Sequence, residues 1–324
     1  MKKWLIIGLL ILAVGVSLGL WASRMLVRSA PSCSAEYPLL DDSVGCDDAQ
    51  PVITKTSYTA LQQSLLAYIQ NEKSSGDTAD IAIFFRDLKD GPVFGINELE
   101  DFTPASLLKL PLAFAYLNVA DEYPDYLQKE LFYTGTSSVI DQNFPPPVSV
   151  KAGQPYTLEE LLQYMISYSD NGAYQMLNDY LAGDPSRKVL LDQTFQELGI
   201  IDPASEDANT VSVRSYASLF RLLYSAAYIS PDHSQLLLQW LSDSSFTQGL
   251  VAGVPEGVTV AHKFGERSLP DGTKQLHDCG IVYFPENPYI LCVMTKGSDW
   301  TKLEGVLRTV SQMVYAEVLS RKQN

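Results

Sequence analysis

Strand-like segments lie near both ends of this chain, and helical patterns fill the long stretch between them. Apolar runs bounded by turn residues predict strands at Ile81–Leu88, Val93–Asn97, Val258–Phe264, Gly280–Phe284 and Tyr289–Thr295. Residues 106–249 carry mostly helical patterns. The economical interpretation is one antiparallel sheet assembled from both ends of the chain, with an all-helical subdomain inserted between them.

Two amphipathic helices are expected to flank this sheet. The first spans Tyr58–Lys73 and ends before Gly76, and the second runs from Leu303 to about Arg321. Within the helical stretch, the segment Thr157–Glu160 is a capping box that predicts the start of a further helix. The sequence therefore predicts an α/β (α+β) domain over 58–324. Its sheet part is 58–105 and 250–324, and its helical part is 106–249.

The N-terminal 28 residues predict a membrane segment. The uncharged stretch Trp4–Ala22 lies between basic residues and is long enough to span a bilayer as a helix. Residues before a cut after Ala22 fit a cleavage site poorly, so an uncleaved signal-anchor is favoured over a cleaved signal. Residues 29–57 are expected to be an extracytoplasmic tether. The domain is then held at the cell membrane by a single pass, or secreted if the segment is cleaved.

Composition excludes several classes of function. The chain has 23 Lys and Arg against 38 Asp and Glu, a net charge of −15, which makes a nucleic-acid partner improbable. Three histidines and four cysteines without ligand spacing argue against a metal site, and no cofactor is expected. We expect a monomer. Cys33 and Cys46 can close a small disulfide loop, whereas Cys279 and Cys292 are either a cross-strand disulfide or two buried thiols.

The first motif with chemical meaning is Ser106-Leu107-Leu108-Lys109, at the start of a helical pattern. Positions i and i+3 of a helix share a face, so the lysine amine can reach the serine hydroxyl. A serine needs an adjacent base to act as a nucleophile, and a desolvated lysine can serve as that base. Backbone N–H groups at a helix start can also help to hold an oxyanion. The alternative is an ordinary surface helix.

Two further motifs follow in the chain. Ser169-Asp170-Asn171 lies at the end of the capped helix, where Ser169 can relay a proton and Asn171 can bind a substrate amide and Lys109. Lys263-Phe264-Gly265 lies on a predicted strand, where the lysine offers positive charge to a substrate carboxylate and the glycine allows close approach to the strand edge. Neighbouring His262 should point to the opposite face.

Together, in this order, the three motifs are those of serine β-lactamases and penicillin-binding proteins. The sequence from about Tyr58 to Arg321 resembles the class A β-lactamase-like family of penicillin-recognising serine hydrolases. The resemblance implies that Ser106 is the acylated nucleophile and that Lys109 is its base. Ser169 and Asn171 would serve proton relay and substrate contact, and Lys263 carboxylate recognition. The second oxyanion donor would be backbone near Glu266 or Arg267.

Two departures from the family pattern bear on function. Phe264 stands where the family usually has a hydroxyl residue, so one hydrogen bond to a substrate carboxylate is missing. The stretch 200–209 is shorter than the family loop that carries the glutamate activating the deacylating water. Glu206 is its only glutamate and is the candidate deacylation base, although a solvated loop acid is favoured.

These features predict a membrane-tethered serine hydrolase acylated at Ser106 by β-lactams or peptidoglycan-peptide-like substrates, with hydrolytic β-lactamase activity favoured. A D,D-peptidase-like or penicillin-binding cell-wall enzyme with slow deacylation is the main alternative. A non-catalytic envelope-binding module is the third. Two arginines, Arg214 and Arg267, are further candidates for contacting a substrate carboxylate.

Overall fold

The computed structural model describes residues 37–41, 44, 58–76, 78–89, 91–135, 142–200 and 210–322. The predicted membrane segment, Cys33, Cys46 and Glu206 lie outside these residues. No helix within the described part of the chain is long and apolar enough to cross a membrane.

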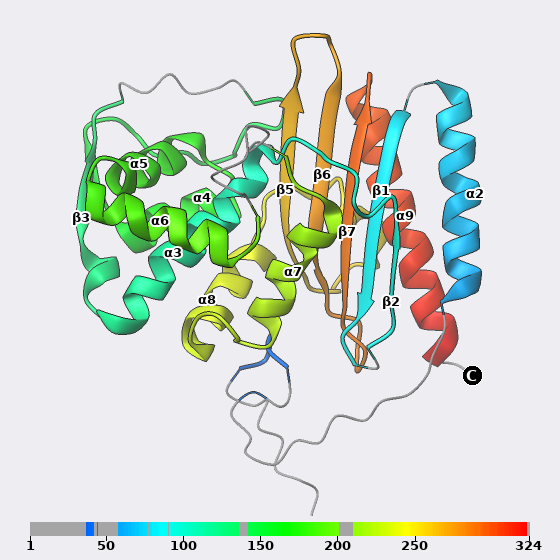
Figure 1. Ribbon diagram of the computed structural model, residues 1–324, viewed down its shortest axis with the longest axis horizontal. Coiled ribbons are helices and arrows are strands. Elements are labelled where there is room, and N and C mark those ends of the chain that lie inside the picture. Colours follow the sequence, from blue (N-terminus) through cyan, green and yellow to red (C-terminus); the bar gives the residue numbers. More distant parts are fainter. Residues whose placement is uncertain are drawn as a thin grey trace, which may run out of the picture.

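A five-stranded antiparallel sheet forms the centre of the molecule, in the order β2-β1-β7-β6-β5 (Figure 1). The strands are β1 (Thr78–Asp87), β2 (Val93–Ile96), β5 (Val260–Ser268), β6 (Lys274–Val282) and β7 (Tyr289–Gly297). Because β1 pairs with β7, strands from the two ends of the chain meet within one sheet. The predicted α+β fold with an inserted helical part is therefore confirmed.

The side chains of β1 alternate between two hydrophobic clusters, as the period of a strand requires. Ile81, Ile83 and Phe85 pack with the helices α2 (Thr59–Ser75) and α9 (Trp300–Lys322), whereas Ala82 and Phe84 pack with the helical part. Figure 1 shows α2 and α9 on one side of the sheet, away from the other helices. Helix α2 ends as predicted, because Gly76 adopts a left-handed conformation with φ of 84°.

The helical part contains several packed helices and short 3₁₀ turns. They are η2 (Ala105–Leu108), α3 (Lys109–Glu122), η3 (Tyr126–Gln128), α4 (Leu158–Ser167), α5 (Asn171–Ala182), α6 (Pro185–Glu197), α7 (Val213–Tyr224) and α8 (Pro231–Ser242). A further 3₁₀ turn, η4 (Leu250–Gly253), follows the helical part and packs against α9. The predicted capping box is present, because the Thr157 hydroxyl accepts from the N–H of Glu160, whose carboxylate accepts from the N–H of Thr157. A two-stranded sheet of β3 (Glu130–Tyr133) and β4 (Gln154–Thr157) was not predicted.

Strand β6 begins at Lys274, six residues before the predicted start at Gly280. Its first half carries Gln275, His277 and Asp278, all buried, and such polar residues weaken a strand pattern in the sequence. The structure accommodates them because each has a hydrogen-bonding partner, described below.

One segment of the predicted tether packs on the domain. Leu40 is buried, and the N–H of Leu39 donates to Gln235 Oε1 on α8 at 2.9 Å. The hydroxyl of Tyr283 donates to the carbonyl of Leu39 at 2.8 Å. Residues 37–41 of the predicted tether therefore pack against the folded domain.

Candidate active site

Ser106 lies in the 3₁₀ turn η2, immediately before α3. The preceding residue, Ala105, has a φ of 49°, a conformation that costs a non-glycine residue of the order of 1–3 kcal/mol. Such a turn persists only where neighbouring contacts hold it. Strand β6 supplies two of these contacts through Thr103: Gln275 Oε1 accepts from its N–H at 3.0 Å, and His277 Nε2 lies 3.1 Å from its carbonyl oxygen.

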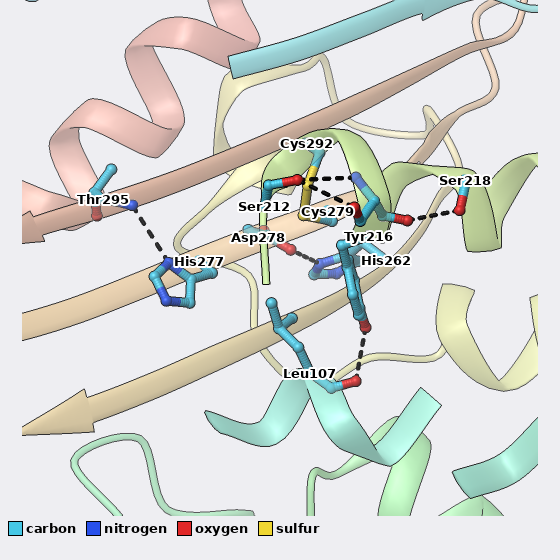
Figure 2. Close-up of a disulfide and its surroundings, with 11 residues drawn as sticks. Leu107, Ser212, Tyr216, Ser218, His262, His277, Asp278, Cys279, Cys292 and Thr295 are labelled. Carbon is cyan, nitrogen blue, oxygen red and sulfur yellow. Dashed lines mark hydrogen bonds and ion pairs between the residues drawn. A yellow bond between two sulfur atoms is a disulfide. The ribbon is translucent and has the colours of Figure 1, made fainter. Parts of the chain in front are cut away.

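Burial lowers the pKa of His277 to about 4, so the imidazole is neutral. Its Nδ1 accepts from the N–H of Thr295 at 3.3 Å, which leaves Nε2 as the donor to Thr103. On the other side of the turn, the hydroxyl of Tyr216 donates to the carbonyl of Leu107 at 3.0 Å (Figure 2). The turn that carries Ser106 is thus held by strand β6 and helix α7.

Lys109 begins α3, three residues after Ser106, and is 2% exposed. Its Nζ donates to the carbonyl of Ser169 at 2.5 Å, to Ser169 Oγ at 3.1 Å and to Asn171 Oδ1 at 2.7 Å. Burial lowers the pKa of Lys109 to about 7, although the charges of Asp170 and Glu266 oppose the shift. A substantial fraction of this lysine is therefore a free base at neutral pH.

Ser169 lies in the turn between α4 and α5, with a φ of 55°. The next residue, Asp170, caps α5 by accepting from the N–H of Ala173 at 2.6 Å, and Asn171 is the first residue of that helix. This local geometry directs the Ser169 hydroxyl between two buried lysines: Lys109 Nζ is 3.1 Å away and Lys263 Nζ is 2.9 Å away.

Lys263 lies on β5, the strand at the end of the sheet next to the helical part (Figure 1). Its Nζ also donates to the carbonyl of Phe264 at 3.0 Å. Burial and the nearby charge of Lys109 lower the pKa of Lys263 well below its ordinary value. Gly265 packs against η2, where an added Cβ would lie 3.0 Å from the carbonyl oxygen of Pro104. Strand β5 therefore contacts the turn that carries Ser106.

The structure brings together all but two of the predicted site residues. They lie on η2, α3, the α4–α5 turn, the start of α5 and β5, and are Ser106, Lys109, Ser169, Asn171, Lys263, Gly265 and Glu266. Arg267 is exposed near the end of β5, and Glu206 lies outside the described residues. Arg214, a weaker candidate, forms an ion pair with Glu98 at 2.6 Å.

Two pairs of residues cross-link neighbouring strands of the sheet (Figure 2). Cys279 and Cys292 face each other on β6 and β7 and form a disulfide, which resolves the two alternatives left by the sequence. His262 is buried and its Nδ1 lies 2.7 Å from Asp278 Oδ1. As predicted from strand alternation, His262 does not share the face of Lys263.

Sequence reasoning missed the residues that hold this site in place. Gln275, His277 and Tyr216 support the turn that carries Ser106. Gln142 Nε2 donates to the carbonyl of Ser169 at 3.3 Å. The signal that was available was the cluster of polar residues before Gly280, which interrupts an otherwise apolar sheet sequence.

Comparison with known proteins gives a consistent result. Residues 61–318 match the model of the Beta-lactamase enzyme family. The extended-spectrum beta-lactamase PER-1 of Pseudomonas aeruginosa is 26% identical over 240 residues, covering 68% of this chain and 76% of that protein. A beta-lactamase of Citrobacter koseri is 27% identical over 260 residues, covering 76% and 84%.

Solved structures agree on the fold. A mutant of PBP-A in an acyl-enzyme complex with penicillin G superimposes with a TM-score of 0.68 at 26% identity, covering 83% of this chain and all of that one. The TLA-3 extended-spectrum beta-lactamase gives a TM-score of 0.69 at 20% identity, covering 81% and 99%.

Proposed function

Because the chain belongs to the β-lactamase enzyme family, we propose that it is a class A-like serine β-lactamase whose Ser106 is acylated by β-lactams and whose acyl-enzyme is then hydrolysed. The observation that carries the proposal is the position of the Ser169 hydroxyl between Lys109 and Lys263, at 3.1 and 2.9 Å. Two lysines far apart in the sequence meet there at one serine hydroxyl, as acid–base chemistry beside a serine nucleophile requires.

Acylation begins with proton transfer from Ser106 to the free-base form of Lys109. Burial makes that form available near pH 7, and the i, i+3 spacing places the amine on the same face as the hydroxyl. Ser106 Oγ then attacks the lactam carbonyl. The oxyanion is expected to be held by the backbone N–H groups of Ser106 and Glu266, since β5 packs against η2 at Gly265.

Collapse of the tetrahedral intermediate requires a proton for the leaving nitrogen. The Ser169 hydroxyl can deliver it, because it is hydrogen-bonded to both lysines and can be reprotonated by Lys109. Lys263 offers positive charge to a substrate carboxylate, and Asn171 offers its side-chain amide to an amide group of the substrate. With these contacts in place, a catalytically inert binding module is disfavoured.

Deacylation separates the proposed β-lactamase from its main alternative. Hydrolysis of the acyl-enzyme needs a positioned water, and Glu206 is the only glutamate of the short stretch 200–209 that could activate it. The similarity to PBP-A, a protein captured as an acyl-enzyme with penicillin G, favours a penicillin-binding or D,D-peptidase-like enzyme with slow deacylation as the second candidate.

The cellular setting is also a proposal. An uncleaved N-terminal segment around Trp4–Ala22 would hold a monomeric domain on the outer side of the cell membrane. The Cys279–Cys292 disulfide supports an oxidising compartment, where such bonds persist. Fractionation of cells and protease accessibility of the domain would test this placement.

The test of activity uses the soluble domain with its packed segment, from residue 37 onward, mixed with a chromogenic β-lactam while absorbance and intact mass are followed. Sustained colour release without accumulated adduct is expected of a β-lactamase. A stable adduct after one turnover would instead support the penicillin-binding alternative. The absence of both would contradict acylation altogether.

Two variants assign the steps. Ser106→Ala should abolish colour and adduct together. Glu206→Ala should leave the rate of adduct formation unchanged and trap the adduct if Glu206 is the deacylation base. Equal turnover by Glu206→Ala and the unmodified protein would remove Glu206 from the mechanism.

A further inference from the structure

The segment 142–147, here called the crossing loop, runs from the helical part to β5, the last strand of the sheet (Figure 1). At one end, Gln142 Nε2 donates to the carbonyl of Ser169 at 3.3 Å. Two residues later, Phe144 packs in the hydrophobic cluster of α2 and α9, on the other face of the sheet. The crossing loop therefore wraps around the edge of β5, from the face that carries Lys263 to the opposite face.

Two anchors hold the crossing loop on that opposite face. The Glu266 carboxylate accepts from the N–H of Asn143 at 3.0 Å, from Asn143 Nδ2 at 2.7 Å and from the N–H of Phe144 at 3.0 Å. The ring of Phe144 lies edge-on to three aromatic rings, those of Phe246, Phe264 and Trp300. Because charge-assisted hydrogen bonds and ring packing act together, the position of the preceding residue, Gln142, is fixed as well.

The carbonyl that Gln142 contacts is part of the acid–base site. Lys109 Nζ donates to the same oxygen at 2.5 Å, and the hydroxyl of the same residue, Ser169, lies between Lys109 and Lys263. Ser169 has a φ of 55°, a conformation that persists only where neighbouring contacts hold it. Two donors, one from α3 and one from the crossing loop, hold its carbonyl.

Sharing one acceptor has a consequence for Lys109. A hydrogen bond to the ammonium form of a lysine favours that form, and the Gln142 amide takes up part of the capacity of the Ser169 carbonyl to accept. Loss of the amide leaves this carbonyl to Lys109 alone, which should raise the pKa of the lysine. The other groups that face Lys109 stay in place: the carboxylates of Asp170 and Glu266, the ammonium of Lys263 and the ring of Tyr174.

We propose that Gln142 is a positioning residue for acylation: the crossing loop, anchored on the far face of β5, holds the Gln142 amide against the Ser169 carbonyl and thereby sets how Lys109 meets Ser169. The proposal rests on the acylation of Ser106 proposed above. It adds to that reaction a residue that touches neither the nucleophile nor the substrate.

The experiment measures single-turnover acylation by a chromogenic β-lactam as a function of pH. Gln142→Met keeps the length of the side chain and removes the donor. The pH of half-maximal rate should rise by about 0.3–1 unit, so the ratio of the rate at pH 6 to the rate at pH 9 should fall about two- to tenfold. A loss of stability alone would not move this midpoint.

Gln128→Met is the matched control, because it removes a glutamine donor whose partner, Glu159, lies outside the site. It should leave the pH profile unchanged. An unchanged midpoint in Gln142→Met, or one that moves to lower pH, would overturn the proposal.

Phe144→Ala tests the crossing loop separately. It cuts the aromatic anchor on the far face of β5 and leaves Gln142 in the chain. The midpoint should move in the same direction as in Gln142→Met, by a smaller amount. A midpoint equal to that of the unmodified protein would contradict the part assigned to the loop.

Failure of the unmodified protein to form an adduct would refute the proposed acylation and not the positioning. In that case NMR of isotope-labelled lysines in Ser106→Ala measures the pKa of Lys109 directly, with its resonance assigned by its absence from Lys109→Met. Gln142→Met must still raise this pKa, and an unchanged value would overturn the proposal.

Discussion

Strands β1 and β7, here called the centre of the five-stranded sheet, and strands β6 and β5, here called its edge, are buried to similar degrees but are built from different residues. At the centre, Ile83 and Leu291 are fully buried among apolar side chains from α2 and α9. On the edge side, Lys263 of β5 and His277 and Asp278 of the neighbouring strand β6 are 1% exposed or less. Burial of an apolar group stabilises the fold by itself, whereas a buried polar group must find partners or destabilise it.

Each polar residue at the edge has such partners, and those partners determine where it lies. His277 contacts Thr103, and Asp278 accepts from His262 and from the N–H of Leu250 at 2.8 Å. The comparison shows how one sheet can serve two purposes. Its centre supplies stability, and its edge uses some of that stability to hold a hydroxyl and two lysines at set distances.

The largest expected effect is loss of activity at the edge without loss of the fold. Lys109→Met removes the proposed base but keeps an apolar side chain of similar length in a buried position. We expect the rate of acylation by a chromogenic β-lactam to fall at least about a thousandfold. Circular dichroism should show a folded protein, and a global loss of structure would contradict the assignment of this lysine to chemistry.

At the centre of the sheet we expect loss of stability without loss of activity. Leu291→Ala, on β7, should lower the free energy of unfolding by about 2–5 kcal/mol, because it leaves a cavity in a packed cluster. Acylation by the protein that remains folded should keep its rate within about twofold. Urea unfolding and active-site titration measure the two quantities. A large loss of specific activity with unchanged stability would contradict the assignment of stability to the centre of the sheet and of activity to its edge.

A smaller effect is expected from the disulfide that joins β6 to β7 on the edge side of the sheet. Replacing both Cys279 and Cys292 by Ala removes a cross-link with a sequence separation of 13. The free energy of unfolding should fall by about 3 kcal/mol, as loop-closure entropy predicts for such a loop. The control is the unmodified protein, unfolded and refolded under reducing conditions so that Cys279 and Cys292 are both thiols. Equal urea midpoints for all forms would show that the cross-link adds no stability.

Much of the fold could be predicted because its signals are local. Helix α2 with its terminal Gly76, the capping box at Thr157 and the apolar strands β1 and β7 each carry a complete pattern within a short window. The lysines and serines of the site were found in the same way, from short motifs in a fixed order.

The features that the sequence did not predict depend on contacts between distant parts of the chain. The first half of β6 is a strand because Gln275 and His277 meet Thr103, more than 170 positions away in the sequence. Likewise, nothing near Glu266 indicates that Asn143 will bind its carboxylate. Such residues gain partners only in the folded protein, so local patterns do not reveal them.

The central claim is that a buried, partly neutral Lys109 activates Ser106, and the pH dependence of acylation tests it most directly. Burial lowers the pKa of Lys109 to about 7, while the negative charges of Asp170 and Glu266 oppose the shift and Lys263 lies on the other side of Ser169. Only the free base can accept the proton, so the single-turnover acylation rate should rise with pH, reach half its maximum near pH 7 and level off above pH 8. A rate that does not change between pH 5.5 and 9, or that rises only near the ordinary lysine pKa, would contradict the account.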